Sequence, residues 1–235
     1  MSFHPEKTEF SKELEDKLSV EKIIKESLFP HAHFTTTKAC GNMKDGENRA
    51  AVLSALGFDA RKLVLARQVH GSRVRRVSKD DYGKFIEGCD GLITDDSSIS
   101  LGIFTADCVP VLMVSKDSAV KAAIHAGWKG LAEGIIENAA DMFLSEFGIK
   151  PADIAAYTGP CIQECCYEVG PELESVFKVK LKNGHLNLRE IAENLMRSKG
   201  ISDIFTSGCC TFHEQHLFFS YRRDKTEDRH LTFLA

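Results

Sequence analysis

The stretch ISLGIFTADCVPVLMVSKDSAVKAAIH, residues 99–125, decides the fold. It holds three apolar runs, at 99–105, 109–114 and 120–125, whose length and content of valine, isoleucine and leucine are typical of strands. The link at 115–118 is polar and short, so the last two runs are expected to pair as a β-hairpin. The centre of the chain therefore predicts a β-sheet.

The C-terminal side of this centre predicts helices that alternate with strands. Helices are expected at 131–147 with an end near Gly148, from Pro171 onward, and at 187–199. Strands are expected at 154–158, 201–206, 217–221 and 231–234.

The N-terminal side predicts a similar mixture. Polar, helix-prone sequence at 5–28 and a segment at 47–57 that stops at Gly57 indicate helices. Strands are expected at 63–69 and 73–77, joined through a turn at Gly71. Hairpins mixed with helices predict a mixed α/β domain in which helices cover the faces of the sheet.

Composition narrows the classes of function. The 235 residues suit one large domain, and a formal net charge of −4 does not suggest a nucleic-acid surface. The densest basic stretch, residues 73–79, reads as a solvated edge strand. Without a secretory signal or an apolar run near the ~18 residues of a membrane span, we expect a cytoplasmic protein with no membrane partner. The eight cysteines are then expected to be reduced thiols.

Three residues stand at positions that suit chemistry. His70 ends a predicted strand before Gly71, Cys108 lies between two predicted strands, and His125 ends another strand before a turn. Side chains at strand ends are exposed on a rigid base. Two imidazoles and one thiolate suit zinc with an open fourth position, but the same groups without a metal could be a cysteine nucleophile with a histidine base. Their spacing does not choose between these sites.

Seven motifs in order give the chain a resemblance to a known family. They are QVHG (68–71), CDGLIT (89–94), TADCVP (105–110), HAGWKG (125–130), GPCI (159–162), CYEVG (166–170) and FSYRRD (219–224). The chain closely resembles the YfiH-like family, long labelled multicopper polyphenol oxidase or laccase-domain proteins, over about residues 31–235. That range would be a single catalytic domain, and residues 1–30 would be an N-terminal helical extension.

The resemblance implies a four-layer α/β/β/α fold related to that of cysteine hydrolases. It also implies that His70, Cys108 and His125 bind zinc and form the catalytic centre. The implied activity is a purine nucleoside phosphorylase that acts on adenosine, inosine and related nucleosides with phosphate, with adenosine deaminase activity in the same site. The protein would be a monomer or a small homo-oligomer.

The older family label implies copper, but the residues favour the nucleoside assignment. A multicopper oxidase needs several copper centres and many paired histidines, and this chain has only nine histidines. For phosphate and substrate we expect Lys38, Asp107 and Arg222 to contribute. Lys38 stands in TTKACG (36–41), where the family carries an arginine, so a point charge replaces a bidentate group.

Two other classes of function stay open. One is a metal-free hydrolase or amidase that uses Cys108 and His125 with Asp107 as the orienting group, with cell-wall precursor editing as a role associated with some relatives. The other is a non-catalytic interaction protein that keeps only the fold. The joint presence of His70, Cys108 and His125 argues against the second class.

Overall fold

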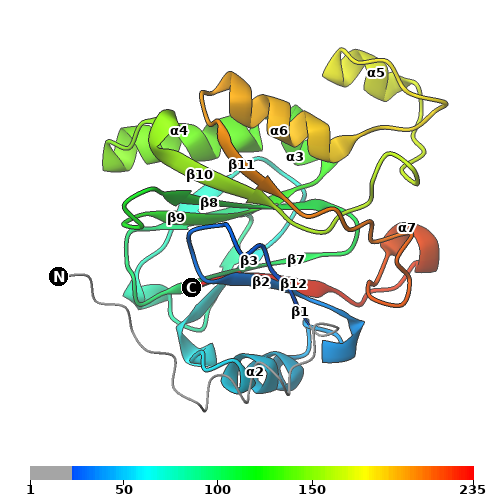
Figure 1. Cartoon of the computed structure of the whole chain (residues 1–235). Coiled ribbons are helices and arrows are strands. Elements are labelled where there is room, and N and C mark those ends of the chain that lie inside the picture. The colour runs from blue at the N-terminus through cyan, green and yellow to red at the C-terminus, as the bar shows by residue number, and fades with distance from the viewer. Residues whose placement is uncertain (1–22) are drawn as a thin grey trace.

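Two six-stranded β-sheets lie face to face in the computed structural model, which describes residues 23–235 (Figure 1). The first sheet has the order β1 (Ile23–Ile24), β2 (His33–Thr36), β12 (His230–Leu234), β7 (Ser100–Thr105), β3 (Leu63–Arg67) and β5 (Phe85–Glu87). The second has the order β11 (Asp203–Thr206), β10 (Ile154–Thr158), β8 (Val109–Ser115), β9 (Lys121–Ala126), β6 (Gly91–Thr94) and β4 (Val74–Arg76). Both sheets mix parallel and antiparallel pairs.

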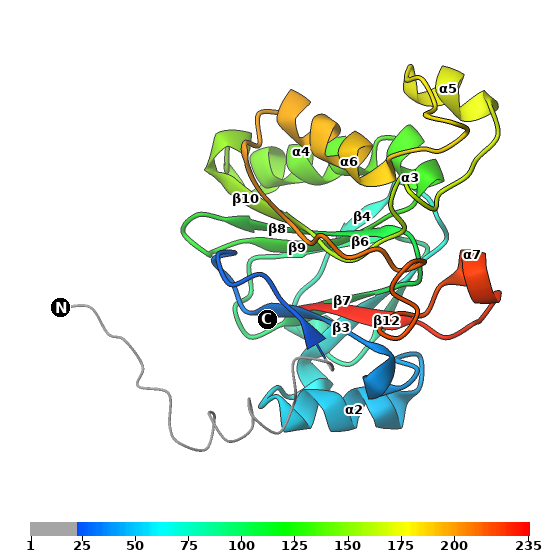
Figure 2. The same cartoon turned by 45° about the vertical axis from the view of Figure 1, so that its right-hand side comes forward.

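Helices complete two outer layers, as Figure 2 shows. The outer face of the first sheet is covered by α2 (Gly46–Ala55), and that of the second by α3 (Trp128–Ala132), α4 (Ile135–Phe147) and α6 (Leu188–Ser198). Two shorter helices, α5 (Glu172–Phe177) and α7 (Tyr221–Asp224), lie to one side. The predicted four-layer α/β/β/α arrangement is confirmed. None of the helices within residues 23–235 has the length and apolarity to cross a membrane.

The alternation of side chains along the strands explains the layers. In β8, Val111 and Met113 join the core beneath α4 and α6, whereas Leu112 and Val114 join the core between the two sheets. A third core packs Leu53 of α2 against the first sheet. Because such strands are buried on both faces, they read as unbroken apolar runs rather than alternating ones. The predicted hairpin of β8 and β9 is confirmed by their antiparallel register.

Several predicted elements differ from the structure. The strands expected at 63–69 and 73–77 are β3 and β4, which belong to different sheets, so the segment around Gly71 crosses between the sheets. The helix expected at 131–147 is two helices, because Gly134 adopts a left-handed conformation (φ +87°) between α3 and α4. The prediction of helix over 5–28 is wrong at Ile23–Ile24, which pair with β2, and its residues 5–22 lie outside the described residues.

The strand expected at 217–221 is also wrong. Phe218 and Ser220 are buried, as alternate residues of a strand would be, but residues 217–220 belong to none of the strands that the structure describes. The backbone N–H of Phe218 instead closes a turn onto the carbonyl of Glu214 at 3.0 Å, and the Ser220 hydroxyl caps α7 by accepting from Arg223 N. Alternating burial therefore arose here from a loop that packs inward.

Candidate active site

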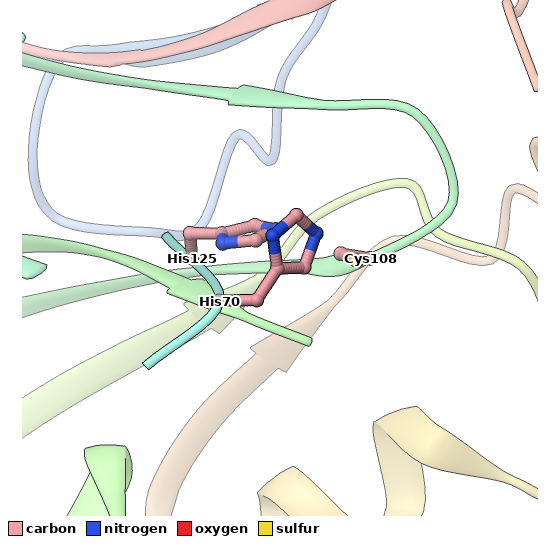
Figure 3. A group of neighbouring side chains, drawn as sticks. All are labelled: His70, Cys108 and His125. Atoms are coloured by element: carbon pink, nitrogen blue, oxygen red, sulfur yellow. The ribbon is translucent and has the colours of Figure 1, made fainter. Parts of the chain in front are cut away.

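His70, Cys108 and His125 come together at one end of the paired sheets. Their ligand atoms all lie within 4.8 Å of one another. The two imidazole rings stand edge to face with centroids 4.8 Å apart and Cys108 beside them (Figure 3). His70 is exposed, Cys108 is half-buried and His125 is buried in β9. The structure therefore makes one site of residues that are distant in sequence.

Chain crossings between the sheets produce this convergence. His70 lies in the crossing from β3 in the first sheet to β4 in the second, and its φ of +61° marks a sharp turn. Cys108 lies in the crossing from β7 to β8. Val109 pairs with Ala126, so the start of β8 meets the end of β9 and sets Cys108 beside His125.

Asp90 holds two of these segments in place. Its fully buried carboxylate accepts hydrogen bonds from the backbone N–H groups of Val69, His70 and Gly71 at 2.9–3.0 Å. It also accepts a bond from Nδ1 of His125 at 2.8 Å, which leaves Nε2 as the free ring nitrogen of that histidine. A carboxylate behind a ligating histidine is a recurrent way to fix its orientation and tautomer.

The thiol and the buried imidazole support each other's charged forms. Burial disfavours the thiolate of Cys108, but the charge of His125 and hydrogen bonds from both histidines outweigh it and lower the pKa to about 6. Burial also disfavours the charged form of His125, but the Cys108 charge and the hydrogen bond to Asp90 raise its pKa to about 9. Without a metal, the pair is therefore a thiolate and an imidazolium near neutral pH.

Two glycines of the HAGWKG motif make room for this arrangement. A Cβ at Gly127 would lie 3.2 Å from the Cys108 sulfur and 3.4 Å from the His70 ring. A Cβ at Gly130 would lie 2.7 Å from the backbone oxygen of Gly71, in the crossing that carries His70. Both positions need glycine because other groups of the site approach so closely.

A cavity of about 800 Å³ opens over the three side chains. Four aromatic residues line it: Phe85, Phe104, Tyr167 and Tyr221. Four basic residues line it as well: Lys44, Arg67, Arg222 and Arg229. Gln68 fixes one wall, because its side-chain amide both donates to and accepts from the backbone of Phe104 at 2.7 Å. The cavity thus joins apolar stacking surfaces to an anion-attracting lining.

Asp107 and Arg222 both line this cavity, as does the reactive trio. The Asp107 carboxylate accepts from the hydroxyl of Thr211 at 2.8 Å and from the backbone N–H of Arg222 at 2.7 Å. It therefore ties two C-terminal loops together and does not orient a histidine. The orienting role expected of Asp107 in a cysteine hydrolase belongs to Asp90 instead.

Lys38 is placed differently from the other expected site residues. It is absent from the cavity lining, and its Nζ donates to the backbone oxygen of Gln215 at 2.9 Å. It also lies 3.9 Å from the Asp224 carboxylate and over the ring of Phe219. These contacts anchor the segment that leads into α7, which carries Arg222.

Asp90, within the CDGLIT motif, is a residue of the site that was not predicted from the sequence. The available signal was its position directly before strand β6, whose partner β9 carries His125. The cavity aromatics were not predicted because Phe85, Phe104 and Tyr167 are far apart in the sequence and only the fold brings them together.

The trio fits a bound metal ion by its chemistry. Two imidazoles and one thiolate are the borderline-soft donors that zinc accepts when three protein ligands leave a fourth position open. Asp90 supplies the usual carboxylate behind a ligating histidine. The residues present therefore fit a metal ion that accepts nitrogen and sulfur ligands.

Comparisons with known proteins agree with this geometry. Residues 37–235 match the family model described as "Multi-copper polyphenol oxidoreductase laccase". The chain is 32% identical to "Purine nucleoside phosphorylase YfiH" of Shigella flexneri, over 88% of each chain, and 40% identical to a "Purine nucleoside phosphorylase" of Aquifex aeolicus, over 73% of this chain and 81% of the relative.

Solved structures show the same architecture. The crystal structure of the Bacillus licheniformis hypothetical protein YfiH superposes with a TM-score of 0.85 at 30% identity, covering 93% of this chain and 97% of that one. YlmD from Geobacillus stearothermophilus superposes with a TM-score of 0.82 at 28% identity, covering 91% and 98%. The chain thus belongs to the laccase-like YfiH family.

Proposed function

We propose that this protein is a purine nucleoside phosphorylase. It would convert adenosine, inosine and related nucleosides, with phosphate, to the free purine and ribose 1-phosphate. The observation that carries the proposal is the single cavity that combines aromatic walls, cations and the His70, Cys108 and His125 trio. The printed names of the Shigella flexneri and Aquifex aeolicus relatives support it.

The cavity walls match the two halves of the substrate pair. A purine offers flat faces that stack on aromatic rings, each such contact contributing ~1–3 kcal/mol. Phosphate needs cations, and arginine binds it with two parallel hydrogen bonds. The four rings and four cations of the lining supply both kinds of contact.

Arg222 is the strongest candidate for the phosphate ligand. Arg67 pairs with Glu87 at 2.7 Å, while Lys44 and Arg229 share Glu227. Arg222 packs over the ring of Tyr167 at 5.0 Å and donates to the backbone oxygen of Glu168, and it forms no ion pair among those found in residues 23–235. Its positive charge is therefore the one most available to an incoming anion.

We further propose that His70, Cys108 and His125 hold zinc and that adenosine deamination occurs in the same cavity. When bound, the ion would supply a Lewis acid for the leaving purine and lower the pKa of a water for attack at purine C6. The chain's own part is to fix that centre. Asp90 sets the His125 ring through Nδ1, and its bonds to the backbone of residues 69–71 set His70.

The direct test separates the two reactions by their co-substrate. Purified protein is incubated with adenosine, with and without phosphate, and products are resolved by chromatography. Adenine that forms only with phosphate reports phosphorolysis, and inosine without phosphate reports deamination. Both are expected to disappear in Cys108→Ala and to persist in Cys40→Ser, a thiol outside the cavity lining. Absence of both adenine and hypoxanthine from the wild-type reaction with phosphate contradicts the proposal.

A second function is favoured by one specific arrangement. Thiol, imidazole and carboxylate follow one another as Cys108, His125 and Asp90, the order found in cysteine hydrolases and amidases. The metal content decides between the two functions. Elemental analysis that finds less zinc per chain in His70→Ala than in the wild type, with activity lost on chelation, supports the phosphorylase. Amidase activity that survives chelation supports the hydrolase. Copper in place of zinc would support the oxidase function that the family label names.

A further inference from the structure

A second group of sulfur and nitrogen ligands lies outside the cavity lining. Cys165 and Cys166 stand on a turn after β10, in which the N–H groups of Cys166 and Tyr167 both donate to the carbonyl of Gln163. Cys210 and His213 stand on a turn after β11, which closes where Glu214 N donates to the carbonyl of Cys210 at 2.9 Å.

The two turns are held side by side by the backbone. Residues Cys161 and Cys210 form a parallel β-bridge, and Thr211 N donates to the carbonyl of Cys161 at 3.1 Å. The amide of Gln163 reaches across to the carbonyl of Cys209 at 3.1 Å. The four ligand-bearing positions are therefore neighbours because of the fold.

Three of the four ligand atoms lie close together, and the fourth, the sulfur of Cys210, contacts one of them. One ligand atom each of Cys165, Cys166 and His213 lies within 4.8 Å of the others. The sulfur of Cys165 is 3.8 Å from that of Cys210. In a tetrahedral zinc site with Zn–S bonds of ~2.3 Å, sulfur atoms stand about 3.8 Å apart. The vicinal sulfurs of Cys165 and Cys166, at 3.3 Å, would need to separate by about half an ångström.

We infer that Cys165, Cys166, Cys210 and His213 form a second metal site, which takes a thiophilic divalent cation of the zinc type. Three thiolates and one imidazole fill a tetrahedron, and such closed sites are structural rather than catalytic. Sulfur donors disfavour magnesium and calcium, which take oxygen ligands. The site differs from the His70, Cys108 and His125 centre in residues, in its closed coordination and in its role.

A metal that cross-links the two turns would also affect the cavity. Tyr167, which lines it, follows Cys166 directly, and Thr211, which bonds Asp107 at 2.8 Å, follows Cys210 directly. A metal that joins the two turns would fix both of these neighbours. The second site would thereby hold the wall of the cavity next to Cys108.

The experiment isolates the second site by removing the first. A His70→Ala/Cys108→Ala variant keeps the proposed site and lacks two of the three ligands in the cavity. Wild-type protein and variants are equilibrated with zinc, freed of unbound metal on a desalting column, and analysed for zinc per chain. We expect two zinc ions in the wild type, one in His70→Ala/Cys108→Ala, and none when Cys165→Ser and Cys210→Ser are added to that variant.

Cobalt and a neighbouring thiol supply the controls. Cobalt bound to His70→Ala/Cys108→Ala is expected to show intense sulfur-to-cobalt charge-transfer bands, which the added Cys165→Ser and Cys210→Ser abolish. Cys209→Ser, in the same loop but outside the ligand group, is expected to keep both metal ions. Circular dichroism checks that each variant is folded.

Two results would overturn the inference. One is a folded His70→Ala/Cys108→Ala variant that binds neither zinc nor cobalt, and the other is an intact mass that reveals a disulfide among Cys165, Cys166 and Cys210 in protein purified without oxidant. The readout is metal content and not nucleoside turnover, so it does not depend on the proposed phosphorylase.

Discussion

Asp90→Asn is the substitution that tests the architecture of the catalytic centre most directly. The buried carboxylate receives four hydrogen bonds, from the backbone N–H groups of Val69, His70 and Gly71 and from Nδ1 of His125. Asparagine keeps the shape but replaces one oxygen with an NH₂ group, which donates and cannot accept. Either orientation of the amide therefore leaves two of the four donors without an acceptor.

The magnitude follows from those two bonds. A hydrogen bond to a charged group contributes about 1.5–3 kcal/mol, so the loss of two should destabilise the fold by roughly 3–6 kcal/mol. For a chain of this size each kcal/mol shifts the melting temperature by about 2–4 °C, which predicts a decrease of roughly 6–24 °C. Loss of a carboxylate behind a ligating histidine should also weaken metal binding by about 10–100-fold.

Thermal unfolding and zinc titration measure the two effects, and Asp95→Asn is the matched control. Asp95 directly follows the same strand, β6. Its half-exposed carboxylate pairs with Arg76 at 2.8 Å on the surface, so loss of this charge should cost less than about 1 kcal/mol of stability. If Asp90→Asn melts and binds zinc like Asp95→Asn, Asp90 does not organise the site and the reasoning is refuted.

Three further substitutions probe other parts of the protein. Gly127→Ala should lower kcat/KM by about tenfold or more, because the new Cβ would lie 3.2 Å from the Cys108 sulfur. The control Gly208→Ala should leave kcat/KM unchanged, because a Cβ there meets nothing within 4 Å. Arg222→Gln should raise the KM for phosphate by about tenfold and leave that for adenosine nearly unchanged; equal changes would contradict a phosphate role. Burial lowers the pKa of His230 to about 4, below its unfolded value of 6.5. Between these values the unfolded state binds a proton that the folded state does not, so the free energy of unfolding should fall by about 3 kcal/mol from pH 6.5 to pH 4. His230→Gln should remove that loss, as urea unfolding at both pH values would show.

Sequence patterns predicted the individual helices and strands better than the connections between them. The hairpin of β8 and β9 was predictable because a short polar link leaves two apolar runs few other ways to pair. The assignment of β3 and β4 to different sheets was not predictable, because both strands are short and only six residues separate them. Register and sheet membership depend on partners far away in sequence, such as the pairing of β3 with β7.

The placement of the site follows from the same connections. A charged group inside a stack of buried strands costs free energy unless it is paired, so side chains suited to chemistry collect where strands end and the chain crosses between sheets. Register shows that such ends coincide: β8 begins where β9 ends, and Thr158 and Thr206, the last residues of β10 and β11, pair with each other.

The same end of the second sheet thus carries both ligand groups, because β10 runs antiparallel to β8 and finishes beside its start. The loop after β10 carries Cys165 and Cys166, the loop after β11 carries Cys210 and His213, and the segments at β8 and β9 carry Cys108 and His125. Cys108 and His125 were visible in the sequence as strand-end residues, but only the strand order brings all six residues to one edge. Asp107, bonded to Thr211 beside Cys210 and next to Cys108 in the chain, is the link through which a metal in the loops would act on the proposed catalytic centre.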